Sequence, residues 1–101
     1  MNLESIGSEA FYDCSSLVTF HLSGLKSLES IGERAFSNCK SLKEVNLSGC
    51  VDLESIGSEA FYDCGELVLI DMSMCSNFKR IGAHALSNCN MCLEIKNGRG
   101  K

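Results

Sequence analysis

The chain has 101 residues, the size of a single domain, and its 45% hydrophobic and 22% charged residues are typical of a globular fold rather than a disordered one. A formal net charge of -4 argues against a general nucleic-acid binder. No apolar run approaches the roughly 18 residues of a membrane span, and the first residues lack the basic and apolar segments of a secretory signal.

A repeat of 25 residues organises the whole chain. The string LESIGSEAFYDC begins at Leu3 and recurs, letter for letter, at Leu53. Related strings begin at Leu28 and Phe78, so every step has the same length. The repeat predicts one solenoid domain over residues 1–101, because units too small to bury their own apolar faces must stack on one another. Its four coils are predicted at residues 3–27, 28–52, 53–77 and 78–101, the last of them degenerate and cap-like.

Each coil is expected to contain one helical turn and one strand. In the second coil, apolar residues spaced at i, i+4 and i+5 over residues 31–36 favour a short helical turn. Alternation over residues 42–47 then predicts a strand with Val45 and Leu47 facing inward. Ser48-Gly49 supplies the bend out of the strand. The chain is therefore predicted to be an α/β solenoid with a parallel sheet on one side.

These motifs resemble a known repeat family. The L-x-x-[LIVF]-x-L strands resemble leucine-rich repeats, and L-x-x-I-G-x-x-A-F-x-x-C is similar to the BspA-like subfamily of bacterial and protist surface proteins, from Leu3 to about Ile95. The resemblance implies a right-handed superhelix with strands on its concave face and short helical turns on its convex face. It also implies a non-enzymatic protein-interaction module of the adhesion or host-interaction type.

The sequence departs from that subfamily in two ways. Its period exceeds the usual length of about 23 residues, and no proline follows the strand. The L-S-G-C element at Leu47–Cys50 is instead similar to the cysteine-containing repeats of F-box substrate receptors. That resemblance implies an intracellular scaffold or substrate-receptor segment. The near-identity of two units also leaves open an engineered or relic repeat fragment without a ligand of its own.

The seven cysteines are predicted to be reduced and structural, because each one falls where a small apolar residue packs. One column contains Cys14, Cys39, Cys64 and Cys89; Cys50 and Cys75 replace Leu25, and Cys92 replaces a strand leucine. Neighbouring coils are expected about 4.8 Å apart, which is within the Cα range of a disulfide, so oxidative coupling between equivalent cysteines stays an alternative.

No catalytic, cofactor-binding or metal-binding residue is predicted. Cys89 and Cys92 form a C-x-x-C, but no second pair of ligands stands at zinc-site spacing. His21 is expected on an outward strand position and His84 on the helical turn, neither with a nucleophile and a carboxylate at motif spacing.

The outward positions of the strands, and those beside them, form the candidate protein-binding face. Their chemistry changes from coil to coil while the inward positions stay uniform, which fits either a recognition surface or free drift of exposed residues. Leu69 and Met74 are candidate apolar anchors. Such a face offers roughly 400 Å², below the roughly 800 Å² per partner of a standard interface, so binding by this chain alone is expected to be weak. The candidate residues are Val18, Thr19, His21, Lys43, Glu44, Asn46, Val68, Leu69, Asp71, Met74, Leu93, Glu94 and Lys96.

Charge is divided unevenly along the chain. Residues 1–77 carry 4 basic and 12 acidic side chains, net -8, and residues 78–101 carry 5 basic and 1 acidic, net +4. With Leu3 and Ile6 opening the first coil, self-association through an uncapped N-terminal coil is expected. The other expected partner is a protein of unidentified kind, with no nucleic acid and no membrane. The missing signal and unpaired cysteines favour the cytoplasm, whereas the family resemblance favours the cell surface.

Overall fold

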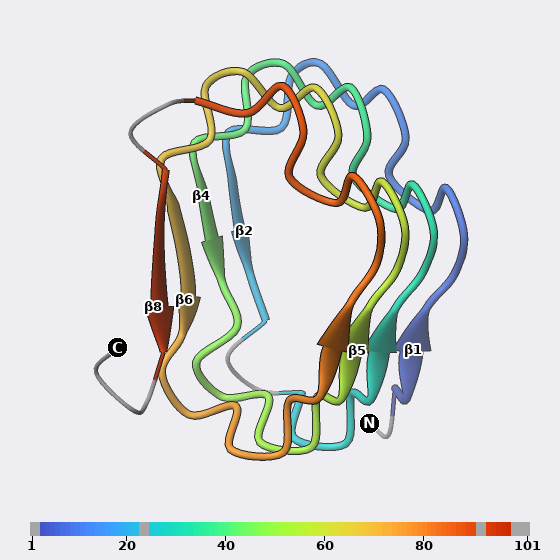
Figure 1. Cartoon of the computed structure of the whole chain (residues 1–101), viewed down its shortest axis with the longest axis vertical. Coiled ribbons are helices and arrows are strands. Elements are labelled where there is room, and N and C mark those ends of the chain that lie inside the picture. The colour runs from blue at the N-terminus through green and yellow to red at the C-terminus, as the bar shows by residue number, and fades with distance from the viewer. Residues whose placement is uncertain (1–2, 23–24, 91–92, 98–101) are drawn as a thin grey trace.

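The computed structural model describes residues 3–22, 25–90 and 93–97. Within these residues the chain forms eight short strands arranged in two parallel sheets, β1-β3-β5-β7 and β2-β4-β6-β8, which face each other across each coil (Figure 1). The strands are β1 (Ser5–Ile6), β2 (Thr19–His21), β3 (Ser30–Ile31), β4 (Glu44–Asn46), β5 (Ser55–Ile56), β6 (Leu69–Met72), β7 (Arg80–Ile81) and β8 (Glu94–Asn97).

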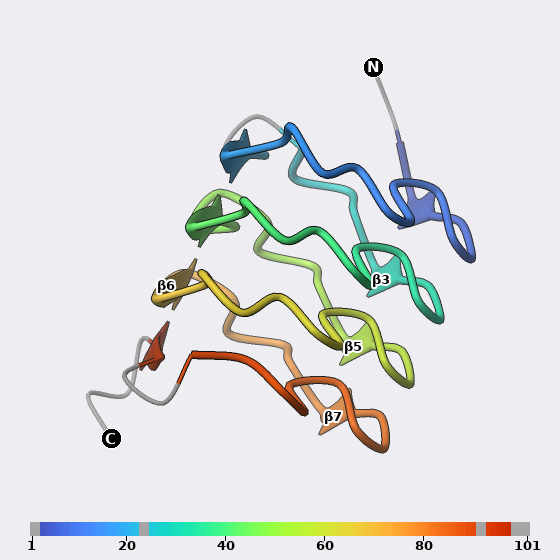
Figure 2. The same cartoon turned by 90° about the horizontal axis from the view of Figure 1, so that it is seen from above.

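The coils stack with the register that the repeat predicts. Phe20 pairs with Val45, Val45 with Ile70, and Ile70 with Ile95, so each step along the sheet is 25 residues. Figure 2 shows the four coils one behind another, with each strand beside its equivalent in the next coil. The predicted solenoid of about four turns is confirmed.

The core lies between the two sheets and consists of the repeated columns. Phe36 is fully buried, and its ring stacks on Phe11 and Phe61 at centroid distances of 5.2 Å on both sides. Phe20 meets the same ring edge-on at 4.7 Å. A column of like residues therefore becomes a continuous stack, which is how units of 25 residues share one core.

The predicted helical turns are wrong. Among the described residues there is no helix; the segment between the two sheets in each coil is a pair of tight turns, which we call the turn arc (residues 8–14, 33–39, 58–64 and 83–89). Two residues of each arc have positive φ, for example Arg34 at 56° and Asn38 at 63°. An α-helix has φ near -63°, so this backbone cannot continue as a helix.

Hydrogen bonding explains why the turn arc replaces a helix. Alternate N–H groups bond to the next coil, as Phe11 N–H does to the carbonyl of Ala35 at 2.8 Å. The intervening N–H groups close local turns, as Tyr12 N–H does onto Glu9 at 3.1 Å. A helix would direct every N–H along its own axis, whereas the turn arc uses half of them to join coils. No described segment is a helix long and apolar enough to span a membrane.

A column of glycines sets how closely the coils approach. A Cβ built on Gly57 would lie 2.7 Å from the backbone nitrogen of Glu33 and 2.8 Å from the carbonyl carbon of Gly32. Gly82 is tighter still against the backbone of Ser58. Glycine is needed here because one backbone passes directly over another.

The core columns are more open at both terminal coils than at the two inner coils. Ile81 and Ile95 are 46% and 38% exposed, although their equivalents Ile56 and Ile70 are almost completely buried. At the first coil, Ile6 is buried, but Leu3 is 40% exposed and Ala10 is exposed, whereas its equivalent Ala85 in the fourth coil is buried. Both ends of the stack therefore leave part of the core exposed.

Candidate functional site

The outer face of the β2-β4-β6-β8 sheet brings the predicted binding residues together in rows. In one row Thr19, Glu44, Leu69 and Glu94 stand side by side as register partners. A second row, two residues further along each strand, contains His21, Asn46, Asp71 and Lys96. Parallel pairing with no slip is what aligns them, since a one-residue shift would turn these side chains into the core. We call these rows, with Val18, Lys43 and Val68, the strand face.

A third row precedes the strands and is partly apolar. The N–H of Lys43 bonds to the carbonyl of Val18 at 2.7 Å, and the N–H of Val68 bonds to Lys43 at 2.9 Å, which places the three in one line. Val18 and Val68 are 45% and 42% exposed on either side of Lys43. Apolar side chains around one cation can cover a partner's apolar surface and fix its orientation.

Leu93 departs from this row. It is partly buried and packs against the core, and its N–H bonds to the carbonyl of Asn90 at 3.0 Å. In the third coil the N–H of Leu67 makes the same kind of bond, to the carbonyl of Cys64. Leu67 stands one position earlier in its repeat than Leu93 does in the fourth. The predicted surface residue Leu93 therefore serves the core in part, as Leu67 does.

Met74 and Leu69 differ in exposure as candidate anchors. Met74 is 57% exposed in the bend that follows β6, at the margin of the strand face. Leu69 is half-buried within β6. A partner can therefore gain more apolar contact from Met74, while Leu69 offers a more rigid position in the centre of the sheet.

Asn46 and Asp71 each close the turn that follows their strand, in addition to lying on the strand face. Oδ1 of Asn46 accepts the N–H of Ser48 at 2.9 Å, and Oδ1 of Asp71 accepts the N–H of Ser73 at 3.0 Å. Partial desolvation opposes ionisation of Asp71, but the hydrogen bonds from Ser73 and the charge of Lys96 lower its pKa overall. An Asn or Asp two residues before Ser, at the end of a strand, is the available signal for such a turn.

The cysteine column is a ladder of thiol hydrogen bonds. From the second coil on, the thiol of this column donates to a backbone carbonyl of the preceding coil: Cys39 Sγ lies 3.2 Å from Phe11 O, and Cys64 Sγ lies 3.1 Å from Phe36 O. Cys50 and Cys75 make the same kind of bond in a second ladder, each at 3.3 Å. Carbonyl oxygens have two lone pairs, so these thiols use acceptor capacity that the local turns leave open.

The described cysteines are all free thiols, as predicted. Burial raises the pKa of Cys50 and Cys89, and raises that of Cys75 to about 11 with help from the neighbouring Cys50 and Asp71. Cys92 lies outside the described residues, so the interpretation that the C-x-x-C is not a metal site stays a prediction. In the described ranges no three His, Cys, Asp or Glu residues cluster as metal ligands would.

The two histidines lie on different parts of the coil. His21 is exposed in β2, on the strand face. His84 is exposed in the turn arc, with Nδ1 3.2 Å from the hydroxyl oxygen of Ser87. Their separate positions match the prediction, and neither is joined to a carboxylate by a hydrogen bond in the described part of the chain.

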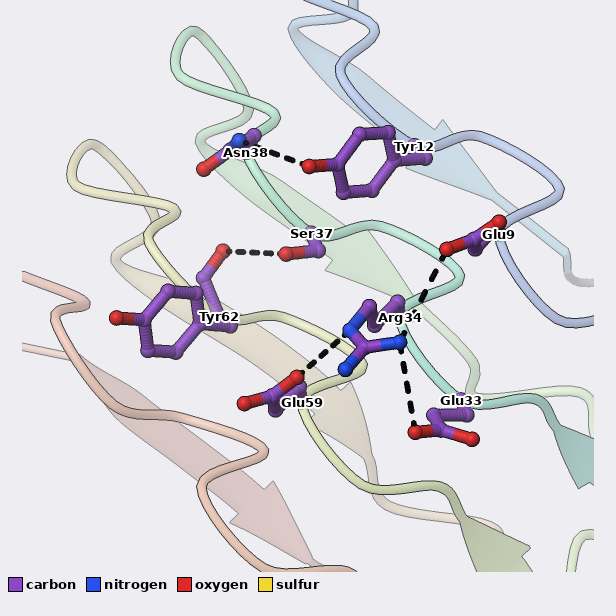
Figure 3. A network of polar contacts seen from close by, with 8 residues as sticks. All are labelled: Glu9, Tyr12, Glu33, Arg34, Ser37, Asn38, Glu59 and Tyr62. Carbon is purple, nitrogen blue, oxygen red and sulfur yellow. Dashed lines mark hydrogen bonds and ion pairs between the residues drawn. The ribbon is translucent and has the colours of Figure 1, made fainter.

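A charged network that the repeat pattern did not predict crosses three coils on the turn arc. Arg34 donates from Nε to the carboxylate of Glu59 at 2.8 Å and lies within 4 Å of Glu33 and Glu9 (Figure 3). These side chains are 30–57% exposed, so the network adds little to the stability of the fold. The sequence signal for this network is the placement of Arg34 one repeat before Glu59.

Comparison with known proteins gives the same architecture. The family model for the BspA type leucine rich repeat region (6 copies) matches residues 1–97. A leucine-rich repeat protein from Bacteroides ovatus shares 27% identity with a TM-score of 0.75, and one from T. pallidum shares 29% with a TM-score of 0.50. Each match covers 92% of this chain. No curated protein matches.

The chain spans only 28% and 51% of the lengths of these two solved proteins. Both are described as leucine-rich repeat proteins, which is the resemblance that the L-x-x-I-G-x-x-A-F-x-x-C segments indicate. With nearly its whole length matched by the family model, and with the repeat register visible in both sheets, the chain belongs to the BspA-type leucine-rich repeat family.

Proposed function

We propose that the chain is a non-enzymatic protein-binding module and that it binds through the strand face. The observation that supports this most is the contrast between the two sides of the same strands. In β4 and β6 the inward side chains Val45 and Ile70 are nearly identical and buried, while the outward column changes from His21 to Lys96 through an amide and a carboxylate. The family, whose members are generally non-enzymatic, suggests protein binding.

The strand face has the composition of a small recognition surface. Val18 and Val68 supply exposed apolar area, Met74 adds a flexible apolar side chain at the margin, and Lys43 and Glu94 supply charges of both signs. We place this sheet on the concave side of a right-handed superhelix, as the family resemblance implies. The partner is a protein of the kind that adhesion or host-interaction repeats bind.

Area limits the affinity of these four coils. The strand face offers roughly 400 Å², about half of what each partner contributes to a standard interface. The solved relatives are two to four times longer than the matched region. We therefore propose that the four coils bind weakly alone and reach useful affinity as part of a longer face or by multivalent display.

A charge-matched pair of variants tests the proposal. Val68→Lys with Leu69→Lys adds two positive charges at the centre of the strand face, and Asp52→Lys makes the same charge change at an exposed position in the bend before β5. Beads that display many copies of the wild type, the double variant or Asp52→Lys are incubated with the same protein mixture, and the bound proteins are quantified by mass spectrometry. We expect proteins captured by the wild type and by Asp52→Lys to be lost from the double variant. Equal capture by all three would contradict binding through the strand face.

A further inference from the structure

Alternate coils carry two different turn arcs. The first and third coils end their arcs in F-Y-D-C, and the second and fourth end theirs in S-N-C. The contact between the second and third coils therefore joins an S-N-C arc to an F-Y-D-C arc. The same two surfaces stand at the two ends of the stack, since the fourth coil carries S-N-C and the first carries F-Y-D-C (Figure 2).

The contact inside the chain is held by a ladder of backbone hydrogen bonds. Three alternate N–H groups of the second coil donate to three alternate carbonyls of the third. The pairs are Arg34 to Ser58, Phe36 to Ala60 and Asn38 to Tyr62, at 3.0, 2.7 and 2.8 Å.

The two ends of the stack present the same groups without partners in the described part of the chain. In the fourth coil, the N–H groups equivalent to the three donors make no hydrogen bond to any described residue; they belong to His84, Leu86 and Asn88. In the first coil, the carbonyls equivalent to the three acceptors receive no hydrogen bond from residues 3–22, 25–90 or 93–97; they belong to Ser8, Ala10 and Tyr12. Donors and acceptors have identical spacing, so one end is complementary to the other.

Charge adds to this complementarity. Inside the chain Arg34 pairs with Glu59 across the contact at 2.8 Å (Figure 3). The equivalent positions at the two ends are His84 and Glu9. His84 has a φ of 58° and Arg34 a φ of 56°, so the backbone has the same left-handed conformation at both positions. A fourth coil with 5 basic and 1 acidic side chain over residues 78–101, net +4, would thus meet a first coil with 1 basic and 3 acidic side chains over residues 3–27, net -2.

Apolar surface points the same way. Ile81 and Ile95 are 46% and 38% exposed at the outer side of the fourth coil. Their equivalents Ile56 and Ile70, which have a further coil above them, are 3% and 1% exposed. A coil docked on the fourth coil would bury both side chains as the chain buries their equivalents.

Gly7 leaves the first coil open to the same close approach. A Cβ at Gly57 would lie 2.7 Å from the backbone of Glu33, but a Cβ at Gly7 would meet no heavy atom within 4 Å. Nothing in the described chain therefore requires glycine at position 7. A fourth coil packed against the first would require it, because Gly7 would then face Gly82 as Gly57 faces Gly32.

We propose that this 101-residue chain assembles head to tail, with the first coil of one copy docking on the fourth coil of another as a fifth coil. The interface is heterologous, so addition does not close at two copies and the average mass grows with concentration. The Cα extents of 28, 27 and 23 Å bound an end face of roughly 600 to 750 Å², close to the roughly 800 Å² per partner of a standard interface.

Gly7→Ala tests the proposal, with Gly65→Ala as its matched control. Both positions have no heavy atom within 4 Å of the new Cβ, so thermal unfolding measured at low concentration should change little in either variant. Sedimentation velocity over a concentration series should show wild type and Gly65→Ala growing beyond 11.0 kDa. Gly7→Ala should weaken this association by roughly ten- to a hundredfold, because its Cβ meets the backbone of the docked coil.

His84→Arg tests the direction of docking. It recreates the Arg34–Glu59 pair across the interface and should tighten association up to about fivefold, an effect that added salt removes. Wild type that stays monomeric throughout, or Gly7→Ala that associates as strongly as wild type, would overturn the proposal. Growth that stops at a dimer and ignores His84→Arg would overturn it too, since that behaviour belongs to two first coils packed face to face.

Discussion

Replacing Phe36 with alanine should destabilise the fold by about 3–5 kcal/mol, because it removes the centre of the aromatic stack. Phe36 is fully buried and contacts the rings of Phe11, Phe20 and Phe61. The neighbouring coils cannot close the gap, since their spacing is set by backbone hydrogen bonds on both sides. A domain of this size has about 5–15 kcal/mol in total, so thermal unfolding should shift downward by at least about 10 °C.

Two further variants separate the stack from general loss of bulk. Phe36→Leu should cost less than about 1.5 kcal/mol, because Leu86 already occupies the same column in the fourth coil. Phe11→Ala, at the partly exposed end of the stack, should cost less than Phe36→Ala. Urea unfolding of the three variants measures this order. Equal losses at positions 11 and 36 would contradict a continuous core.

Gly57→Ala should destabilise the chain by about 1–3 kcal/mol or more, although it adds a single methyl group. The new Cβ would lie 2.7 Å from the nitrogen of Glu33 and 2.8 Å from the carbonyl carbon of Gly32. Both neighbours are backbone atoms, so the coils themselves must move apart and weaken the bonds between β3 and β5. Chemical denaturation of the variant at low protein concentration measures the loss.

Gly7→Ala is the control within the same column. It makes the same chemical change in an identical local sequence, but its Cβ meets no heavy atom within 4 Å. Its stability should remain within about 0.5 kcal/mol of wild type, as for a surface substitution. Similar losses for Gly7→Ala and Gly57→Ala would mean that close approach of the coils is not what requires glycine.

The repeat register was predictable from the sequence because identical residues recur at a fixed spacing. Once Val45 and Ile70 share a column, their strands must pair with no slip, and the outward rows follow. The cysteine ladder was predictable for the same reason. The partial burial of Leu93 was not, because its N–H makes the kind of turn bond that Leu67 makes one repeat position earlier, and a change of one residue leaves no mark in the repeat spacing.

The turn arc could not be predicted from apolar spacing alone. Apolar residues at i, i+4 and i+5 fit a helix, and the bonds that override it join residues 24 positions apart. Positive φ at Glu9 and Arg34 runs against the preference of those residues. One signal was present: the column Asp13, Asn38, Asp63 and Asn88 contains only the residue types that tolerate positive φ.

Thiol alkylation read out peptide by peptide tests most directly whether the four coils share one closed core. Cys39, Cys50 and Cys64 are fully buried, so they should stay unmodified in the native chain and react on unfolding. Cys75 is only half-buried, but a pKa of about 11 leaves about a hundredfold less thiolate at pH 8 than a pKa of 9 would, so it should react slowly and faster as the pH rises. Native labelling of Cys39 or Cys64, or a disulfide joining them, would contradict the stacked-coil core.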